Sequence, residues 1–169
     1  MQNCKLSNVP MSSGFLQQKE EDSERLQTTQ QYQSIIGALL YLAVNTRPDI
    51  SIATSILGRR VTKATKADWT ECKKVLRYLR GTVDYELHLG SGKRLQLECF
   101  VDADWTGAVT DRKYNTGFML KLDGGLITWT CRKQTSVALS SCEAEYVALA
   151  ECLQEHQCYG NCLLILAYR

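Results

Sequence analysis

Two aspartates stand two positions apart in FVDADW, residues 100–105, at the end of a stretch with the alternation of a β-strand. Alternate residues of a strand share a face, so Asp102 and Asp104 lie together. The opposite face is apolar and consists of Leu95, Leu97, Cys99, Val101 and Ala103. Paired carboxylates of this kind could bind a cation, or they could simply end an exposed strand in water.

A third carboxylate, Glu145, lies in SSCEAEYVALAECLQE, residues 140–155, which has the period of a helix. The i, i+4, i+7 spacing places Glu145 on the apolar face formed by Ala148, Leu149, Cys152 and Leu153. A carboxylate directed at a core costs several kcal/mol unless it is paired, protonated or bound to a metal. Two interpretations stay open: an ion-paired glutamate at the rim of the stripe, or a glutamate that meets the aspartates of the strand.

The second interpretation predicts a metal site. If the helix packs on the sheet, Asp102 and Glu145 converge, and their mutual repulsion is relieved by a divalent cation. Oxygen ligands suit Mg²⁺ or Mn²⁺. Two such ions about 4 Å apart are a common device for cleaving a phosphodiester.

The elements that must position these carboxylates follow in the order helices, strands, helix. Residues 1–30 are polar, lack a core pattern and are predicted to form a mobile leader. Helices are expected over 32–46, where the apolar residues extend nearly all round, and from Pro48 to about Arg60. A third helix begins at the capping box TKAD, residues 65–68, and ends at Gly81.

The second half of the chain reads as strands and one helix. Strands are predicted over 85–89, 95–105, 116–122 and 126–131, and the last three form an antiparallel meander. The last two strands are joined by a hairpin at Asp123-Gly124-Gly125. The final helix begins at a capping box made by Ser140 and Glu143.

Composition limits the function classes. The 169 residues are 44% apolar and 22% charged, as in a soluble globular protein. The net charge of +2 leaves nucleic-acid binding to local patches, of which one is visible. Four basic residues form a stripe on the third helix that could track a phosphate backbone or could be a solvated face: Lys66, Lys73, Arg77 and Arg80.

The cysteines and the apolar runs exclude other classes. Eight cysteines without a C-x-x-C pair, and only two histidines, predict free thiols in a reducing compartment and no zinc site. The longest apolar run, residues 35–44, is far shorter than the ~20 residues of a membrane span. An intracellular location, cytoplasmic or nuclear, without a membrane partner is therefore expected.

Four long segments resemble one family. YQSIIGALLYLAVNTRPDISIATSIL, VLRYLRGT, VDADWTGAVTDRKYNTGFMLKL and ITWTCRKQTSVALSSCEAEYVALAEC are similar to the C-terminal part of a copia-type retrotransposon Pol polyprotein. The similarity covers roughly residues 4–155. It implies an α+β fold in which residues 31–90 are the helical tail of the reverse transcriptase. Residues 91–169 would then be a partial ribonuclease H-like domain with three antiparallel strands and a helix.

The resemblance also implies roles for residues. The first catalytic aspartate of the family falls on Asp102 and its catalytic glutamate on Glu145. Both would bind Mg²⁺ or Mn²⁺ and cleave the RNA strand of an RNA–DNA hybrid, whereas Asp104 is not expected to be a ligand. The paired aspartates of the polymerase lie upstream in the family, so this chain is not expected to polymerise DNA.

The chain departs from the family pattern at several points. No residue matches the third carboxylate, and the later parallel strands and helices of a complete ribonuclease H fold are not recognisable. Ala108 stands where many relatives have Asp, and Tyr114 replaces a small residue. The expectation is therefore a Pol polyprotein fragment that is inactive alone and relies on the rest of the polyprotein. The alternatives are a non-catalytic nucleic-acid-binding remnant and a fragment without a stable fold.

Overall fold

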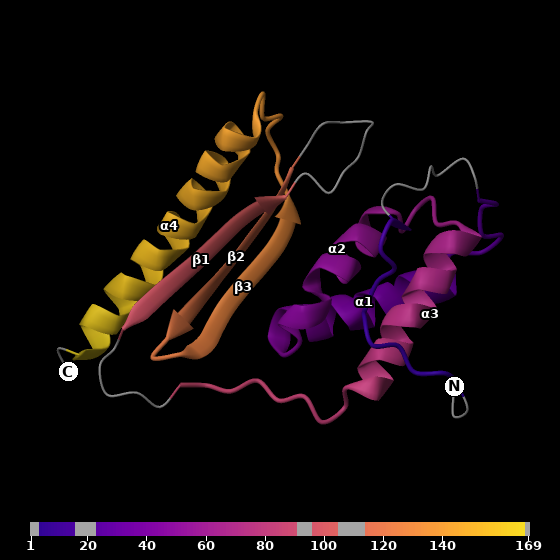
Figure 1. Cartoon of the computed structure of the whole chain (residues 1–169), viewed down its shortest axis with the longest axis horizontal. Helices are drawn as coiled ribbons and strands as arrows, with labels where there is room; N and C mark the ends of the chain where they lie inside the picture. Colours follow the sequence, from indigo (N-terminus) through magenta and orange to yellow (C-terminus); the bar gives the residue numbers. More distant parts are fainter. Residues whose placement is uncertain (1–3, 16–22, 91–95, 105–113, 168–169) are drawn as a thin grey trace. The chain divides into compact units, whose positions relative to one another are not determined.

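The computed structural model describes residues 4–15, 23–90, 96–104 and 114–167. The chain divides into two compact units, unit 1 over Met1–Glu86 and unit 2 over Leu87–Arg169. Figure 1 shows helices in unit 1 and a three-stranded sheet with one long helix in unit 2. The α+β class predicted from the sequence is confirmed for the described residues.

Unit 1 is built from helices that share one core. Its elements are α1 (Gln30–Asn45), the 3-10 turn η3 (Pro48–Ile50), α2 (Ser51–Arg59) and α3 (Lys66–Gly81). Tyr32 of α1 is fully buried, and its hydroxyl donates a hydrogen bond to the carbonyl of Leu57 at 2.9 Å. Burial raises the pKa of Tyr32 well above its ordinary value. The other large aliphatic side chains that are fully buried in this core are Ile36, Leu39, Ile50, Leu57 and Val75.

Helix α1 differs from the expectation of burial on all sides. It buries a single stripe made by Tyr32, Ile36, Leu39 and Ala43. On the opposite side Tyr41 is 69% exposed and Val44 is 72% exposed. The apolar pattern of a helix shows which residues could be buried, but it does not show whether another element packs on each apolar face.

The start of α3 follows the sequence signal closely. The hydroxyl of Thr65 accepts a hydrogen bond from the backbone N–H of Asp68, and the carboxylate of Asp68 accepts one from the backbone N–H of Thr65. The predicted capping box is therefore confirmed. At the other end Gly81 is the last helical residue rather than the stop, and Thr82 is the C-cap.

The segment predicted as a mobile leader contributes to the core of unit 1, which corrects the prediction for its described part. Phe15 is 2% exposed, and the guanidinium of Arg60 lies 5.1 Å from the centre of its ring. The backbone N–H and the hydroxyl of Ser12 donate to the carboxylate of Glu71 at 2.9 and 2.7 Å. The polar composition of residues 1–30 gave no indication that Ser12 and Phe15 contact the rest of unit 1.

One arginine connects the loop after α1 to the end of α3. Arg47 donates to both carboxylate oxygens of Asp49, at 2.9 and 2.7 Å, and to the carbonyl of Thr82 at 3.1 Å. The hydroxyl of Tyr78 donates to the same carboxylate at 2.8 Å. Burial alone would raise the pKa of Asp49, but the hydrogen bonds from Arg47 and Tyr78 outweigh it and hold the pKa below its usual value.

We predict that Arg47→Ala lowers the local free energy of unfolding of α1 and α3 by about 2–3 kcal/mol, because the carboxylate of Asp49 loses its bidentate partner. Amide hydrogen exchange of the two helices measures this loss. The contribution of the Asp49 carboxylate is fully present above about pH 4, its ordinary pKa, and is lost as the pH falls through its lowered pKa in the folded state. The difference between wild type and variant should therefore shrink in acid. The exposed Arg59→Ala is the matched control and should change stability by less than about 0.5 kcal/mol.

Unit 2 contains an antiparallel meander. Its elements are β1 (Leu97–Asp104), β2 (Asn115–Leu122), β3 (Gly125–Lys133) and α4 (Ser141–Ala167), and the strand order is β1-β2-β3. The predicted hairpin is confirmed: Asp123 has φ 49° and Gly124 has φ 81°, and two left-handed residues in succession define a tight type I′ turn. Residues 85–89, expected as a strand, have no regular secondary structure. The alternation of apolar and polar residues is typical of a strand, but a strand also needs a neighbouring strand with which to form hydrogen bonds.

Helix α4 runs along one face of this sheet (Figure 1). Its buried stripe is made of small residues, Ala144, Ala148 and Cys152, each 0% exposed. Small side chains let the helix lie close to β1 and β2, where Phe118 and Leu120 are buried beneath it. Within the described ranges, every helix is too short or too polar to cross a lipid bilayer.

Candidate functional site

An open pocket of about 270 Å³ lies where β1 meets α4. Three consecutive residues of β1 line it, together with two residues of α4 one helical turn apart: Val101, Asp102, Ala103, Glu145 and Leu149. Asp102 and Glu145, the two residues to which the family resemblance assigns catalytic roles, therefore line the same pocket.

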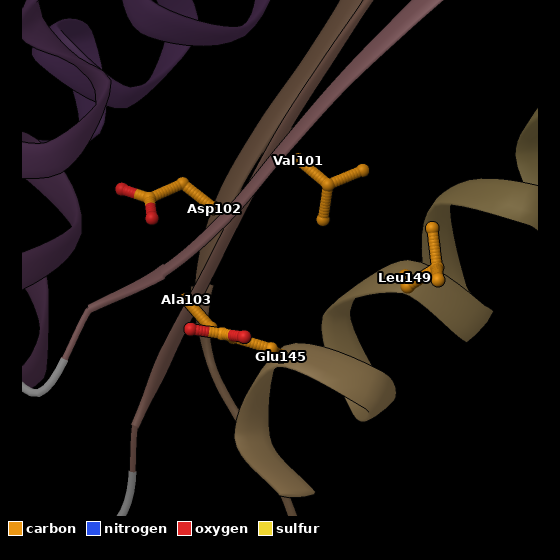
Figure 2. Close-up of a pocket in the computed structure, with 5 residues that line it drawn as sticks. All are labelled: Val101, Asp102, Ala103, Glu145 and Leu149. Carbon is orange, nitrogen blue, oxygen red and sulfur yellow. The ribbon is translucent and has the colours of Figure 1, made fainter. Parts of the chain in front are cut away.

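The two carboxylates approach the pocket differently (Figure 2). Val101 is directed toward α4, so strand alternation directs Asp102 to the other face of the sheet. In Figure 2 the carboxylate of Asp102 points away from α4, whereas that of Glu145 extends from α4 toward β1 near Ala103. The structure thus brings the two residues to one pocket without turning their carboxylates toward each other.

Glu145 lies at the rim of the buried stripe of α4. It is exposed, and its neighbour one turn on, Leu149, is 40% exposed. Of the two interpretations left open by the sequence, the position of Glu145 agrees with the one at the rim, because the small residues that contact the sheet lie one position to the side. Within the described part of the chain, the carboxylate of Glu145 makes no hydrogen bond or ion pair. It is available to a ligand at little cost in desolvation.

The described residues do not complete a metal site. They contain no group of three or more His, Cys, Asp or Glu side chains that could hold an ion. Asp104 ends β1 and pairs with Asn115, but its side chain lies outside those described, as does Ala108. In the described sheet β1 pairs only with β2, so its other edge is open beside the pocket. A further oxygen ligand could approach along that edge.

The start of α4 fixes the position of Glu145. The hydroxyl of Ser140 accepts a hydrogen bond from the backbone N–H of Glu143 at 3.1 Å, as the capping box predicted. The carboxylate of Glu143 accepts from the N–H of Leu139 at 2.7 Å, one residue earlier than expected. The helix therefore begins where the sequence indicated, with half of the predicted reciprocal pair.

Gln134 is a positioning residue that the sequence pattern did not reveal. It is 2% exposed and follows β3 directly. Its side-chain amide donates to the carbonyl of Ala144 at 2.8 Å and to the hydroxyl of Thr116 at 3.2 Å, so it ties the first turn of α4 to β2. A polar residue after a strand is typical of a loop, and only the three-dimensional structure shows that its side chain has two hydrogen-bond partners.

We predict that Gln134→Ala lowers the free energy of local opening at residues 141–150 by about 1–3 kcal/mol, because two buried hydrogen bonds are lost beside Glu145. Hydrogen exchange of that segment provides the measurement. Gln154→Ala, an exposed position on the same helix, is the control and should alter the exchange by less than about 0.5 kcal/mol. Equal effects of the two substitutions would contradict the assigned role.

The predicted basic stripe lies on α3 in unit 1, and its four members have different surroundings. Lys66 forms an ion pair with Glu24 at 2.6 Å. Lys73 is exposed and lies 6.0 Å from the ring centre of Trp69. The Nε of Arg77 is buried and has no hydrogen-bond partner among the described residues, and Arg80 donates to the sulfur of Cys4 at 3.4 Å. Lys73 is thus the residue of the stripe best placed to meet a phosphate.

Comparison with known proteins places these observations in a family. The retrovirus-related Pol polyprotein from transposon TNT 1-94 of Nicotiana tabacum is 41% identical over 120 residues, which cover 71% of this chain and 9% of the polyprotein. The corresponding protein from transposon RE2 of Arabidopsis thaliana is 40% identical over 127 residues, 75% of this chain and again 9% of the polyprotein. The chain thus spans less than a tenth of the length of these two relatives.

A shorter relative covers a similar range. Secreted RxLR effector protein 161 of Plasmopara viticola is 42% identical over 124 residues, 73% of this chain and 87% of the effector. No family model matches the chain, and no solved structure matches it either. On the identity to the two transposon proteins, over more than two thirds of its length, the chain belongs to the family of retrovirus-related Pol polyproteins of copia-type transposons.

Proposed function

We propose that unit 2 is a ribonuclease H-like part of a Pol polyprotein and that it acts on the RNA strand of RNA–DNA hybrids only together with a further carboxylate. Unit 1 would be the tail of the reverse transcriptase. The observation that carries the proposal is the pocket at the open edge of β1, which is lined by Asp102 and Glu145.

The ligand atoms of this pocket suit a hard cation. Both acidic residues offer carboxylate oxygens, which Mg²⁺ and Mn²⁺ prefer over nitrogen or sulfur. When bound, such an ion would lower the pKa of a water molecule and stabilise charge on a phosphate. Asp102 and Glu145 would hold it. Both side chains are exposed, so each can change its rotamer toward the open edge of β1 at low cost, and an ion could be held between them there.

The same geometry explains why the chain alone should be inactive. Two carboxylates leave most positions of an octahedral ion to water, which weakens the binding and leaves the ion poorly oriented. Catalysis depends on holding charge in place before the reaction begins. A third oxygen ligand at the open edge of β1 would meet both needs.

We predict that the chain binds Mn²⁺ weakly and that Asp102→Asn and Glu145→Gln each lower the affinity about tenfold or more, because each removes a charged ligand. Electron paramagnetic resonance of free Mn²⁺ measures the binding. Glu155→Gln, an exposed acid on the same helix, is the matched control and should leave the affinity unchanged. Equal binding by all four proteins would refute the site.

A cleavage assay with a labelled RNA–DNA hybrid tests whether the chain alone has a complete catalytic site. We predict no cleavage above background by the folded chain in Mg²⁺ or Mn²⁺. Cleavage that Asp102→Asn abolishes would support the site but contradict the need for a further carboxylate. Cleavage that survives both substitutions would come from a contaminating nuclease or from another site.

A second candidate function is nucleic-acid binding without catalysis, through the stripe on α3. The exposed Lys73 favours it, although Lys66 is already paired with Glu24. If the stripe tracks phosphates, affinity for a duplex falls with salt, because each neutralised phosphate releases counterions.

The logarithm of the affinity is expected to fall linearly with the logarithm of the salt concentration. We predict that Lys73→Gln makes this negative slope shallower by about 0.9, the value of one phosphate contact on a duplex. Lys66→Gln should change the slope less, because that ammonium group is partly neutralised by Glu24. Fluorescence anisotropy with a labelled hybrid over a range of salt concentrations tests this. Binding that ignores salt, or equal effects of both substitutions, would exclude the stripe as the contact.

A further inference from the structure

Two cysteine thiols meet across the contact between β1 and α4. Cys152 of α4 is 0% exposed and belongs to a buried apolar cluster with Phe118 and Leu120. Cys99 of β1 packs against this cluster and is half-buried. The thiol of Cys99 lies close enough to that of Cys152 to raise its pKa, and both thiols are free.

Both cysteines lie on the faces by which β1 and α4 pack against each other. Cys99 lies two residues before Val101 on the face of β1 that is directed toward α4. Cys152 is on the stripe of α4 that begins with Ala144 and Ala148 and contacts the sheet.

We propose that Cys99 and Cys152 are a thiol modification site, at which a small-molecule disulfide such as oxidised glutathione converts the pair into a reversible disulfide that fastens α4 to β1. This inference does not depend on the proposed catalytic function.

The reaction balances in two exchange steps. The thiolate of Cys99 attacks one sulfur of oxidised glutathione, forms a mixed disulfide and releases one glutathione thiolate. Cys152 then loses its proton to solvent and attacks the sulfur of Cys99, which releases the second glutathione thiolate. Two protein thiols are oxidised, one glutathione disulfide is reduced, and two protons are transferred from the protein to the glutathione thiolates or to solvent.

Burial decides the order of the two steps. It raises the pKa of the Cys152 thiol well above its ordinary value, and the contact with Cys99 adds to this effect. Cys152 is therefore a poor first nucleophile, whereas the half-buried Cys99 can be reached by a small disulfide. Formation of the crosslink should accelerate as pH rises, because both attacks require a thiolate.

The crosslink would act on the pocket described above. Cys99 lies next to the pocket residues of β1, and Cys152 lies one turn after Leu149. A disulfide between them closes a long loop, which restricts the unfolded chain and stabilises the folded one. Oxidation would thus hold the helix that carries Glu145 against the strand that carries Asp102.

Peptide mapping tests the proposal on the full chain. After incubation with oxidised glutathione at pH 8 and blocking of free thiols, cleavage after Lys, Arg and Glu yields residues 99–112 and 152–155, each with one cysteine. We expect these two peptides to be recovered as a linked pair that is two hydrogens lighter than their sum. The melting temperature of unit 2 should rise by about 5–10 °C and return to its starting value with dithiothreitol.

Two variants make the result specific. Cys152→Ser should abolish the linked pair and the rise in melting temperature. Cys142→Ser removes an exposed thiol on the same helix and should leave both unchanged. Recovery of Cys99 and Cys152 as separate blocked or glutathione-bearing peptides would overturn the proposal, and so would linkage that forms only in urea. If Cys152→Ser does not fold, the wild-type peptide map still decides the question.

Discussion

The candidate site depends on one packing contact, the small-residue stripe of α4 against the alternating apolar face of β1. Ala144, Ala148 and Cys152 have little volume, so the helix approaches the strand closely and buries these three side chains completely. The residues one position to the side are then held at the rim, where Glu145 and Leu149 line the pocket. A larger residue in the stripe would push the helix outward and separate the two walls of the pocket. The acidic character of the site is thus a consequence of where apolar packing stops.

The units use different physical means to hold their elements together. In unit 1 a partly buried network joins charges and aromatic rings: the guanidinium of Arg47 is shared between Asp49 and Thr82 and lies 5.8 Å from the ring centre of Tyr78. Removal of one partner leaves a partly buried charge without its compensating group, so such a network is sensitive to single changes. In unit 2 the contacts of α4 are mainly apolar, and two polar contacts join the helix to the sheet, the hydrogen bonds of Gln134 and the ion pair of Arg132 with Glu151. The second arrangement tolerates polar residues at its rim, which is where a ligand-binding pocket needs them.

The sequence predicted local features better than faces and partners. The capping box at Thr65 and the turn at Asp123 depend on a few adjacent residues, and both were recovered. Residues 85–89 alternate like a strand, yet they form none, because a ladder partner is a property of the whole sheet. Phe15 was assigned to a mobile leader because its neighbours are polar, and a single aromatic residue in the core carries no periodic signal. The i, i+4, i+7 spacing of Glu145 leaves the centre and the rim of the stripe open, because spacing alone cannot distinguish them, and only the structure places Glu145 at the rim.

Strand alternation also explains why the site was predicted as a set of residues but not as a geometry. If Val101 packs beneath α4, then Asp102 must be directed to the opposite face, and no choice of helix position can reverse this. The two carboxylates can therefore meet only around the edge of β1, beyond the last hydrogen-bonded strand, rather than across the helix–sheet interface. That edge is open in the described sheet. A ligand, or a further strand that carries an acidic residue, would have to approach this same edge of β1. Addition of such a strand would therefore extend the sheet and bring the further carboxylate to the site at the same time.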